Sequence, residues 1–325
     1  MFQDCGSADA AYMEPLKECQ VVGLGTAVRA VIVRPTEPLV LDGAVSGSVV
    51  VGRGGMVCNT LAVAAALGAR VGGVIASGSD EAGTAARAAL AADGVATSFI
   101  TTERTPVTVT LAEGLHRTSI MGEAGAREPD LDPAAVEAAW EALALRPAWV
   151  LLTLPALDSA AGRRFVELAR KAGAAVAVTL SSSGHVRARA SGLQDLLSGV
   201  DLVFGNTDEH AELQTAGAAA SLMIATDGPH GATVLCQGAE TVKVPIRARV
   251  DVVDTTGAGD AFAGGVLSTL QPVSLATADL KHAIEVGHSS AGVIVAKMGA
   301  EPGDSHQALR EIGLRTVLHR TIPDS

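Results

Sequence analysis

The chain has 325 residues, a formal net charge of −11, 48% hydrophobic residues and 2% aromatic residues. This length and apolar content allow one large domain or two small ones, with a core built mainly from alanine, valine and leucine. The acidic balance argues against nucleic acid and against an anionic membrane surface as the main partner.

The N-terminal residues 1–19 contain acidic residues and no apolar block, so they predict a loose extension and no secretory signal. No run of about 18 apolar residues occurs elsewhere, and no membrane span is expected. The cysteines form no C-x-x-C pair, which gives no support to a zinc or dithiol redox site; they are Cys5, Cys19, Cys58 and Cys236. These features are typical of a cytoplasmic protein with free thiols.

Short apolar runs alternate with alanine-rich helical stretches along the rest of the chain. The predicted strands are residues 20–25, 71–77, 149–154, 174–180, 201–205 and 221–226. The predicted helices are residues 59–69, 80–94, a stretch near 158–172 and one that follows Asn206. This order predicts an α/β fold with a mostly parallel central sheet covered by helices on both faces.

Two regions interrupt this alternation, because residues 26–53 and 97–121 lack helical periodicity and are rich in valine and threonine. The first of them contains turn residues at Pro35, Pro38, Gly43 and Gly47. We expect short strands that form a small separate sheet beside the core, in the position of a lid.

Several well-known motifs are missing. No lysine follows a glycine, which excludes a Walker A phosphate loop. Gly23 and Gly25 give half of a dinucleotide-binding fingerprint, but its third small residue would fall at Val28, so a nicotinamide enzyme is a weak alternative. Neither H-E-x-x-H nor G-x-S-x-G occurs, which leaves zinc-protease and α/β-hydrolase chemistry without support.

The segment VVDTTGAGDAFAGG, residues 252–265, predicts a strand end, a glycine turn and the start of a helix. Free N–H groups at Gly257, Ala258 and Gly259 would form an anion hole. A carboxylate beside that hole, Asp260, suits the removal of a proton from a hydroxyl that attacks a phosphoryl group. A structural turn with a helix-capping aspartate is the alternative.

This segment resembles the C-terminal signature of the PfkB, or ribokinase-like, family of carbohydrate and nucleoside kinases. Three more segments match that family in the same order: GRGGMVCNTLAVAAALGA (52–69), VDLVFGNTDEHAEL (200–213) and ATDGPHGA (225–232). The resemblance covers roughly residues 20–303. The segments VTLSSSGHV and VDLVFGN favour the adenosine-kinase-like branch.

The resemblance implies a ribokinase-like kinase domain over residues 20–305, with the lid from about 26–53 and 97–121 and a C-terminal tail over 306–325. It implies transfer of the γ-phosphoryl group of ATP to a primary hydroxyl of a nucleoside or sugar-like acceptor, with Asp260 as the catalytic base. A ribokinase-fold protein with little or no kinase activity, acting as a ligand-binding or regulatory module, is the alternative.

The resemblance also implies the binding residues. Asn206 and Glu209 would place Mg²⁺ and its waters beside the ATP phosphates, although Asn206 also suits a helix N-cap and Glu209 an ordinary surface position. Gly54, Gly55 and Asn59 would contact the acceptor, and the alternative for the two glycines is a tight turn before a helix.

Further positions near ATP follow from the same resemblance. Thr226, Gly228 and Gly231 would lie near the base and ribose, unless they form a plain β-turn. His288 and Lys297 would lie near the adenine, although a lone histidine on such a helix is more often packed or solvated. Asp254 and Thr256 stand where some members bind a monovalent cation such as K⁺. Some members dimerise through lid strands, so a homodimer is also implied.

The chain departs from the family pattern at Ala30, where members usually carry an aspartate that accepts hydrogen bonds from acceptor hydroxyls. Three explanations are open: the acceptor lacks that hydroxyl pair, the lid supplies another group such as Asp42 or Arg53, or catalysis has weakened. Residues 56–58, Met-Val-Cys, replace small polar residues and predict a more apolar acceptor pocket.

Overall fold

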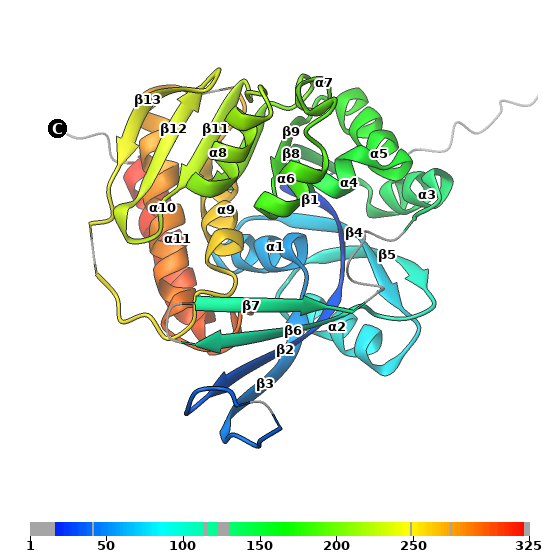
Figure 1. The fold of residues 1–325 in the computed structure, drawn as a ribbon. Coiled ribbons are helices and arrows are strands. Elements are labelled where there is room, and N and C mark those ends of the chain that lie inside the picture. The colour runs from blue at the N-terminus through cyan, green and yellow to red at the C-terminus, as the bar shows by residue number, and fades with distance from the viewer. Residues whose placement is uncertain are drawn as a thin grey trace, which may run out of the picture.

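The computed structural model describes residues 17–321, except residues 41, 114–115, 123–129, 248 and 274. Residues 1–16 of the predicted extension, with Cys5, lie outside the described residues, as do residues 322–325 of the predicted tail. The described chain forms a large sheet with helices on both faces and a smaller sheet beside it (Figure 1).

The large sheet is mostly parallel. Its strands are β1 (Lys17–Thr26), β4 (Val71–Gly78), β5 (Ala96–Thr102), β8 (Leu145–Thr153), β9 (Ala175–Thr179), β10 (Leu202–Asn206), β11 (Leu222–Thr226), β12 (Ala232–Cys236) and β13 (Ala239–Val244). They lie in the order β13-β12-β11-β10-β9-β8-β1-β4-β5. Neighbours from β11 to β5 are parallel, and β12 and β13 add an antiparallel edge. The predicted sheet type is confirmed.

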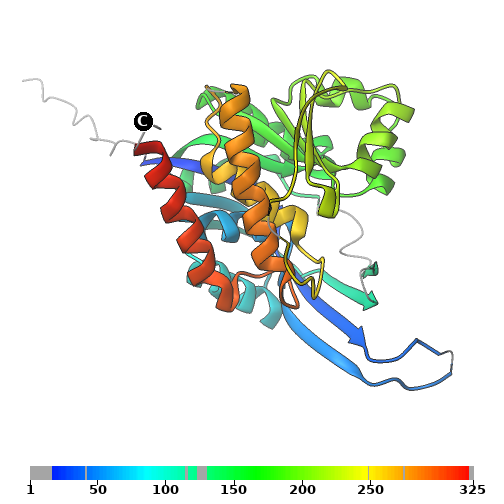
Figure 2. The same ribbon diagram turned by 90° about the vertical axis from the view of Figure 1, so that its left-hand side faces the viewer.

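Helices cover both faces of this sheet, and each face has its own apolar cluster. One face carries α1 (Met56–Ala66), α2 (Glu81–Ala92), α9 (Ala258–Thr269) and α10 (Thr277–Val295), and α11 (His306–Thr321) packs beside α1 and α10 (Figure 2). The other face carries α3 (Pro133–Leu143), α4 (Leu154–Asp158), α5 (Ala160–Lys171), α6 (Ser183–Ala188), α7 (Leu193–Leu197) and α8 (Thr207–Thr215). Because helices cover both faces, every residue of β4 is buried.

The smaller sheet consists of β2 (Val28–Pro35), β3 (Gly47–Gly54), β6 (Val107–Glu113) and β7 (His116–Met121), in the order β3-β2-β6-β7. Its β2–β3 hairpin extends away from the body of the molecule (Figure 2). The expected smaller sheet is confirmed, and we call it the lid. Residues 97–102, expected in the lid, instead belong to β5 and pair in parallel with β4, because α2 returns the chain to the large sheet.

The fold extends beyond the expected ends of the kinase domain. Strand β1 begins at Lys17, where residues 17–19 pair with the start of β8, although these residues were expected in the loose extension. Residues 306–321, expected as a tail, form α11, whose Leu309 is fully buried among α1, α9 and α10. None of the helices in the described ranges has the length and apolar character needed to cross a bilayer.

The glycines of the partial dinucleotide fingerprint lie inside β1 and form no phosphate-binding turn. A Cβ at Gly23 would lie 2.3 Å from Val57 Cγ1, and a Cβ at Gly25 would lie 2.6 Å from Val57 Cβ. Both glycines therefore allow α1 to pack closely on β1, and the nicotinamide-enzyme alternative loses its structural basis.

Candidate active site

A cleft of about 1510 Å³ lies between the lid and the carboxyl ends of the parallel strands. Five of these strands end in a polar residue that lines it: Thr26, Thr153, Thr179, Asn206 and Thr226. The inner face of the lid lines the opposite side with Ala30, Ile32, Val50, Gly52, Thr108, Thr110, Ser119 and Met121. The carboxyl end of a parallel sheet is the usual position of a ligand site in α/β folds.

Helix α9 begins at this cleft. Its N-cap, Gly257, has φ = 78°, and a Cβ there would lie 2.3 Å from Ala300 Cβ, so the position requires glycine. The Ala258 N–H donates to Thr255 O at 3.2 Å. The N–H groups of Gly259 and Asp260 follow in the first helical turn, where helical N–H groups lack intrahelical acceptors. These two donors are the best placed to meet an anion in the cleft.

Asp260 lines the cleft within this first turn. Its Oδ2 accepts a hydrogen bond from Asn59 Nδ2 at 2.8 Å. Burial raises the pKa of Asp260 to about 6, against the opposing effects of the Asn59 hydrogen bond and the charges of Arg117 and Arg53. A carboxylate whose pKa lies near neutrality can accept a proton efficiently at physiological pH.

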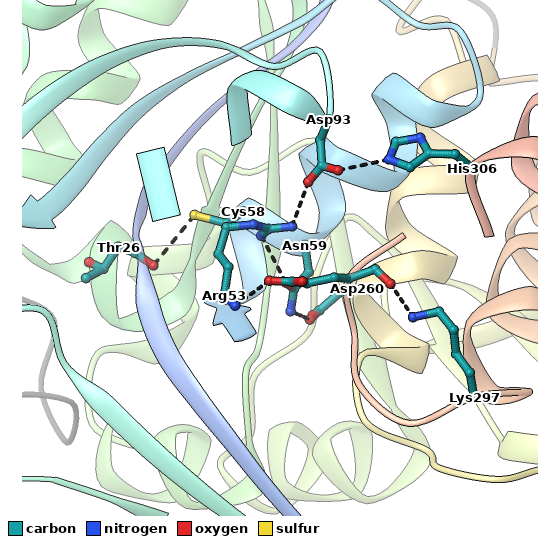
Figure 3. Close-up of polar contacts among 9 residues, drawn as sticks. Thr26, Arg53, Cys58, Asn59, Asp93, Asp260, Lys297 and His306 are labelled. Atoms are coloured by element: carbon teal, nitrogen blue, oxygen red, sulfur yellow. Dashed lines mark hydrogen bonds and ion pairs between the residues drawn. The ribbon is translucent and has the colours of Figure 1, made fainter. Parts of the chain in front are cut away.

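A chain of polar contacts supports Asp260 from behind (Figure 3). The buried Arg53 donates from Nη1 to Asn59 Oδ1 at 3.2 Å, and its Nη2 pairs with Asp93 Oδ2 at 3.0 Å. His306 Nε2 lies 2.9 Å from the other oxygen of Asp93. Asn59, expected to contact the acceptor, is thus held by Arg53 and directed at Asp260.

The substrate-side segment before α1 lies at the same place. Gly55 has φ = 103°, and a Cβ there would lie 2.2 Å from Thr26 O, so the glycine allows a tight turn into α1. Gly54 and Met56 line the cleft. Cys58 Sγ turns away and donates to Thr26 O at 3.7 Å. The expected apolar patch therefore consists of Met56 and Val57 without Cys58.

Neither lid residue suggested as a substitute for the missing aspartate presents a free polar group to the cleft. Asp42 does not line the cleft. Arg53 does line it, but its guanidinium group is directed at Asn59 and Asp93.

Asn206 and Glu209 form a capping box at the start of α8. Asn206 Oδ1 accepts from the Glu209 N–H at 2.8 Å, and Glu209 Oε2 accepts from the Asn206 N–H at 2.9 Å. Both residues line the cleft, and Glu209 is only 6% exposed. The N-cap interpretation of Asn206 is confirmed, and Glu209 is no ordinary surface residue.

The environment of Glu209 fits a nearby cation. Burial raises the pKa of Glu209, against the opposing effects of the Asn206 N–H and the charge of Arg117. A cation in the cleft would favour the ionised carboxylate. Mg²⁺ keeps several waters and needs few protein ligands, and no group of three or more His, Cys, Asp or Glu residues suited to a metal ion occurs in the described ranges.

Arg117 of β7 is a cleft residue that the sequence did not indicate. Its Nη1 donates to Thr255 O at 3.1 Å, two residues before the N-cap of α9. Its charge lowers the pKa values of both Asp260 and Glu209. No sequence signal distinguishes it from any other arginine on a lid strand, because its contact spans 138 residues of the chain.

Asp254 and Thr256 shape the loop that leads into α9. Asp254 is buried, and its Oδ1 accepts from the Thr256 N–H at 2.9 Å and from Thr256 Oγ1 at 2.7 Å. Its Oδ2 accepts from the Gly299 N–H at 3.0 Å. Asp254 therefore ties this loop to the loop after α10, and both of its carboxylate oxygens already have donors.

The positions implied for the nucleoside part of ATP separate into two groups. Thr226 and Lys297 line the cleft. Gly228 (at the start of a 3₁₀ turn, Gly228–His230), Gly231 and His288 do not line it. His288 packs against the Phe262 ring with centroids 5.4 Å apart, and burial lowers its pKa. The packed-histidine alternative is therefore favoured for His288.

The chain belongs to the pfkB family of carbohydrate kinases, because a model of that family matches residues 20–307. It is therefore a phosphotransferase of that family. The chain is also 30% identical over 257 residues to "Bifunctional protein HldE" of Pseudomonas savastanoi pv. phaseolicola, a match that covers 76% of this chain and 53% of that protein. The chain thus spans about half the length of the curated relatives that it matches over most of its own length.

Solved structures share the fold. A probable sugar kinase from Rhizobium etli CFN 42 superposes with a TM-score of 0.74 at 23% identity, covering 92% of this chain and 99% of that chain. The adenosine kinase from Sinorhizobium meliloti superposes with a TM-score of 0.71 at 23% identity, covering 89% and 99%. At this level of identity the likeness concerns the fold, so the adenosine-kinase-like branch stays a prediction.

Proposed function

We propose that this chain transfers the γ-phosphoryl group of ATP to a primary hydroxyl of a sugar, with a nucleoside as the second candidate acceptor. The observation that carries the proposal is Asp260, a cleft carboxylate with a pKa of about 6 in the first turn of α9. Membership of a carbohydrate kinase family supports both ATP as donor and a sugar as acceptor.

In the proposed reaction the acceptor lies between the lid and Asp260. The acceptor oxygen forms a bond to the γ-phosphorus as its proton passes to Asp260, and the bond from the γ-phosphorus to ADP breaks. The N–H groups at the start of α9 stabilise the charge on the transferring phosphoryl oxygens. Asn59 holds the Asp260 carboxylate in place, since it donates to Oδ2 at 2.8 Å.

Bound cations complete the proposal. Asn206 and Glu209 would hold Mg²⁺ through its waters, and the ion would neutralise charge on the ATP phosphates. The loop of Asp254 and Thr256 would bind a monovalent cation such as K⁺ mainly through backbone carbonyls, since hydrogen bonds already occupy Asp254. Thr226 would lie near the nucleoside part of ATP, whereas Lys297 Nζ is bound to the backbone carbonyl of Glu301 beside the lid.

The test is an ADP-release assay with MgATP against sugars, sugar phosphates, nucleosides and deoxynucleosides. We expect acceptor-dependent ADP release, which Asp260→Asn reduces by about 10²- to 10⁴-fold. Asp195→Asn, which changes an exposed carboxylate of α7 outside the cleft, is the matched control and should keep wild-type turnover. No release with any acceptor, or near-wild-type turnover in Asp260→Asn, would contradict the proposal.

We also propose a homodimer through the outer face of the lid. Four apolar residues on this face are exposed: Val49 (61%), Val51 (52%), Val107 (40%) and Ile120 (57%). An exposed apolar sheet face of this kind favours association. Light scattering should show a dimer that Val49→Asp dissociates, and a wild-type monomer at all concentrations would refute the dimer.

A further inference from the structure

The inner face of the lid has a gap in its side chains where it meets the large sheet. Ala30 of β2 pairs with Gly52 of β3, and both residues line the cleft. Gly54 follows on the same face, and a Cβ there would lie 3.1 Å from Ala30 Cβ. Strands β2 and β3 therefore offer an acceptor no polar side chain at this place, and the nearest one on the inner face is Thr108 of β6, which pairs with Ala30.

The carboxylate of Glu301, which comes from the loop after α10, fills this gap. One of its oxygens, Oε1, accepts a hydrogen bond from the backbone N–H of Arg53 on β3, an edge strand of the lid. A Cβ added at Gly52 would lie 3.1 Å and 3.3 Å from the two carboxylate oxygens. Because Gly52 faces the cleft beside Ala30, the Glu301 carboxylate lies where a longer side chain at position 30 would otherwise reach.

Several contacts fix this carboxylate relative to the candidate base. Lys297 Nζ donates to the Glu301 backbone carbonyl. The Gly299 N–H donates to Asp254 Oδ2 in the loop that leads into α9. The N–H of Arg53 donates to Glu301. The guanidinium group of Arg53 also contacts Asn59, which in turn contacts Asp260 (Figure 3). The carboxylates of Glu301 and Asp260 thus line the same cleft, and Arg53 connects them through its backbone N–H and through Asn59.

We propose that Glu301 accepts hydrogen bonds from two neighbouring hydroxyl groups of the acceptor and thereby selects a vicinal diol; this inference rests on the proposed kinase function. An ionised carboxylate only accepts hydrogen bonds, and its two oxygens match the spacing of adjacent hydroxyls. Within the described ranges, the Arg53 N–H is the one hydrogen-bond donor to this carboxylate. The second oxygen and the remaining lone pairs are available to a ligand.

The expected effect is a preference that depends on the hydroxyl pair. Hydrogen bonds to a charged group contribute enough that losing one typically changes affinity by about 10- to 100-fold. An acceptor with the diol should therefore bind wild type about 10- to 100-fold more tightly than its deoxy analogue. Glu301→Gln should bring the ratio of these two affinities close to one, because it weakens the binding of the diol and leaves that of the deoxy analogue unchanged.

The experiment measures acceptor binding by calorimetry in the presence of MgADP, where no phosphoryl transfer occurs. The ligands are adenosine with 2′-deoxyadenosine, D-ribose with 2-deoxy-D-ribose, and the best acceptor of the ADP-release screen with its deoxy analogue. Glu103→Gln, which changes an exposed carboxylate outside the cleft, is the matched control and should keep the wild-type ratio. Ala30→Asp in the Glu301→Gln background places a carboxylate over the same gap and should restore the preference.

The outcomes separate this proposal from the kinase function. ADP release that depends on Asp260, together with an unchanged diol ratio in Glu301→Gln, would overturn the role of Glu301 and leave the kinase function intact. If wild type prefers the diol, Glu301→Gln does not, and no acceptor causes ADP release, Glu301 is supported as a binding residue and the proposed kinase function is contradicted. Binding of no diol by the wild-type protein would overturn the role of Glu301.

Discussion

Replacing Asp260 by asparagine should make the protein more stable at neutral pH while it removes activity. Burial raises the pKa of this carboxyl from 3.8 to about 6 in the folded protein. Below pH 3.8 both the folded and the unfolded chain hold the proton, so ionisation has no effect on stability. As the pH rises towards 6, the unfolded chain ionises first, and the free energy of unfolding falls.

The size of this effect follows from the two pKa values. A rise of the pKa from 3.8 to about 6 lowers the free energy of unfolding by about 3 kcal/mol once Asp260 is ionised. This figure is an upper limit, because the carboxylate lines the cleft and keeps part of its contact with water. Asparagine does not titrate, and its side-chain oxygen can still accept the hydrogen bond from Asn59.

The assay is urea unfolding of wild type and Asp260→Asn at pH values from 4 to 8. The difference in unfolding free energy between the two proteins isolates residue 260, because all other titrating groups are shared. We expect this difference to rise in favour of the variant between pH 4 and pH 7 and then to level off. A difference that stays constant with pH, or that changes in the opposite direction, would refute a raised pKa of Asp260.

Three further substitutions test other parts of the site and core. Arg117→Gln removes a charge that lowers the pKa of Asp260, so the acid limb of the kcat/KM profile should move to higher pH, with about a 10²-fold loss in kcat/KM. Gly257→Ala should lower the unfolding free energy by about 2 kcal/mol in urea titrations and reduce turnover, since the helix start must shift. Trp149→Phe loses the indole hydrogen bond to Leu270 O and should cost about 1–3 kcal/mol with unchanged turnover, because Trp149 lies outside the cleft.

Much of the large sheet was predictable, because a strand covered on both faces is mostly apolar, as β4 is from Val71 to Ala76. The boundary of the lid was not predictable, because β5 (ATSFITT) is a partly exposed edge strand that contains threonine and apolar residues, as lid strand β6 (VTVTLAE) does. The sequence pattern of such a segment predicts a strand, but it does not indicate which of the two sheets the strand joins.

In the candidate site, too, local features were predictable from the sequence and contacts between distant residues were not. Asp260 was predicted from the start of a helix, a local feature with its own sequence pattern, and the Asn206–Glu209 pair from the family resemblance; all three residues line the cleft. The contact between Asn59 and Asp260 joins residues 201 positions apart, and that between Arg53 and Glu301 joins residues 248 positions apart. No spacing rule connects such residues, so the roles of Arg53 and Glu301 emerge only from the fold.

The placement of Asn59 between Arg53 and Asp260 lets a buried arginine support the candidate base without a direct ion pair. A direct ion pair with arginine typically lowers a carboxyl pKa by about 1–3 units, which would make the carboxylate a poor proton acceptor. Here Arg53 pairs with Asp93 and holds the amide oxygen of Asn59, whose nitrogen then orients Asp260. The neutral amide transmits position, and the arginine forms its ion pair with Asp93 instead of Asp260. Burial therefore keeps the pKa of Asp260 near 6 although the charge of Arg53 acts to lower it.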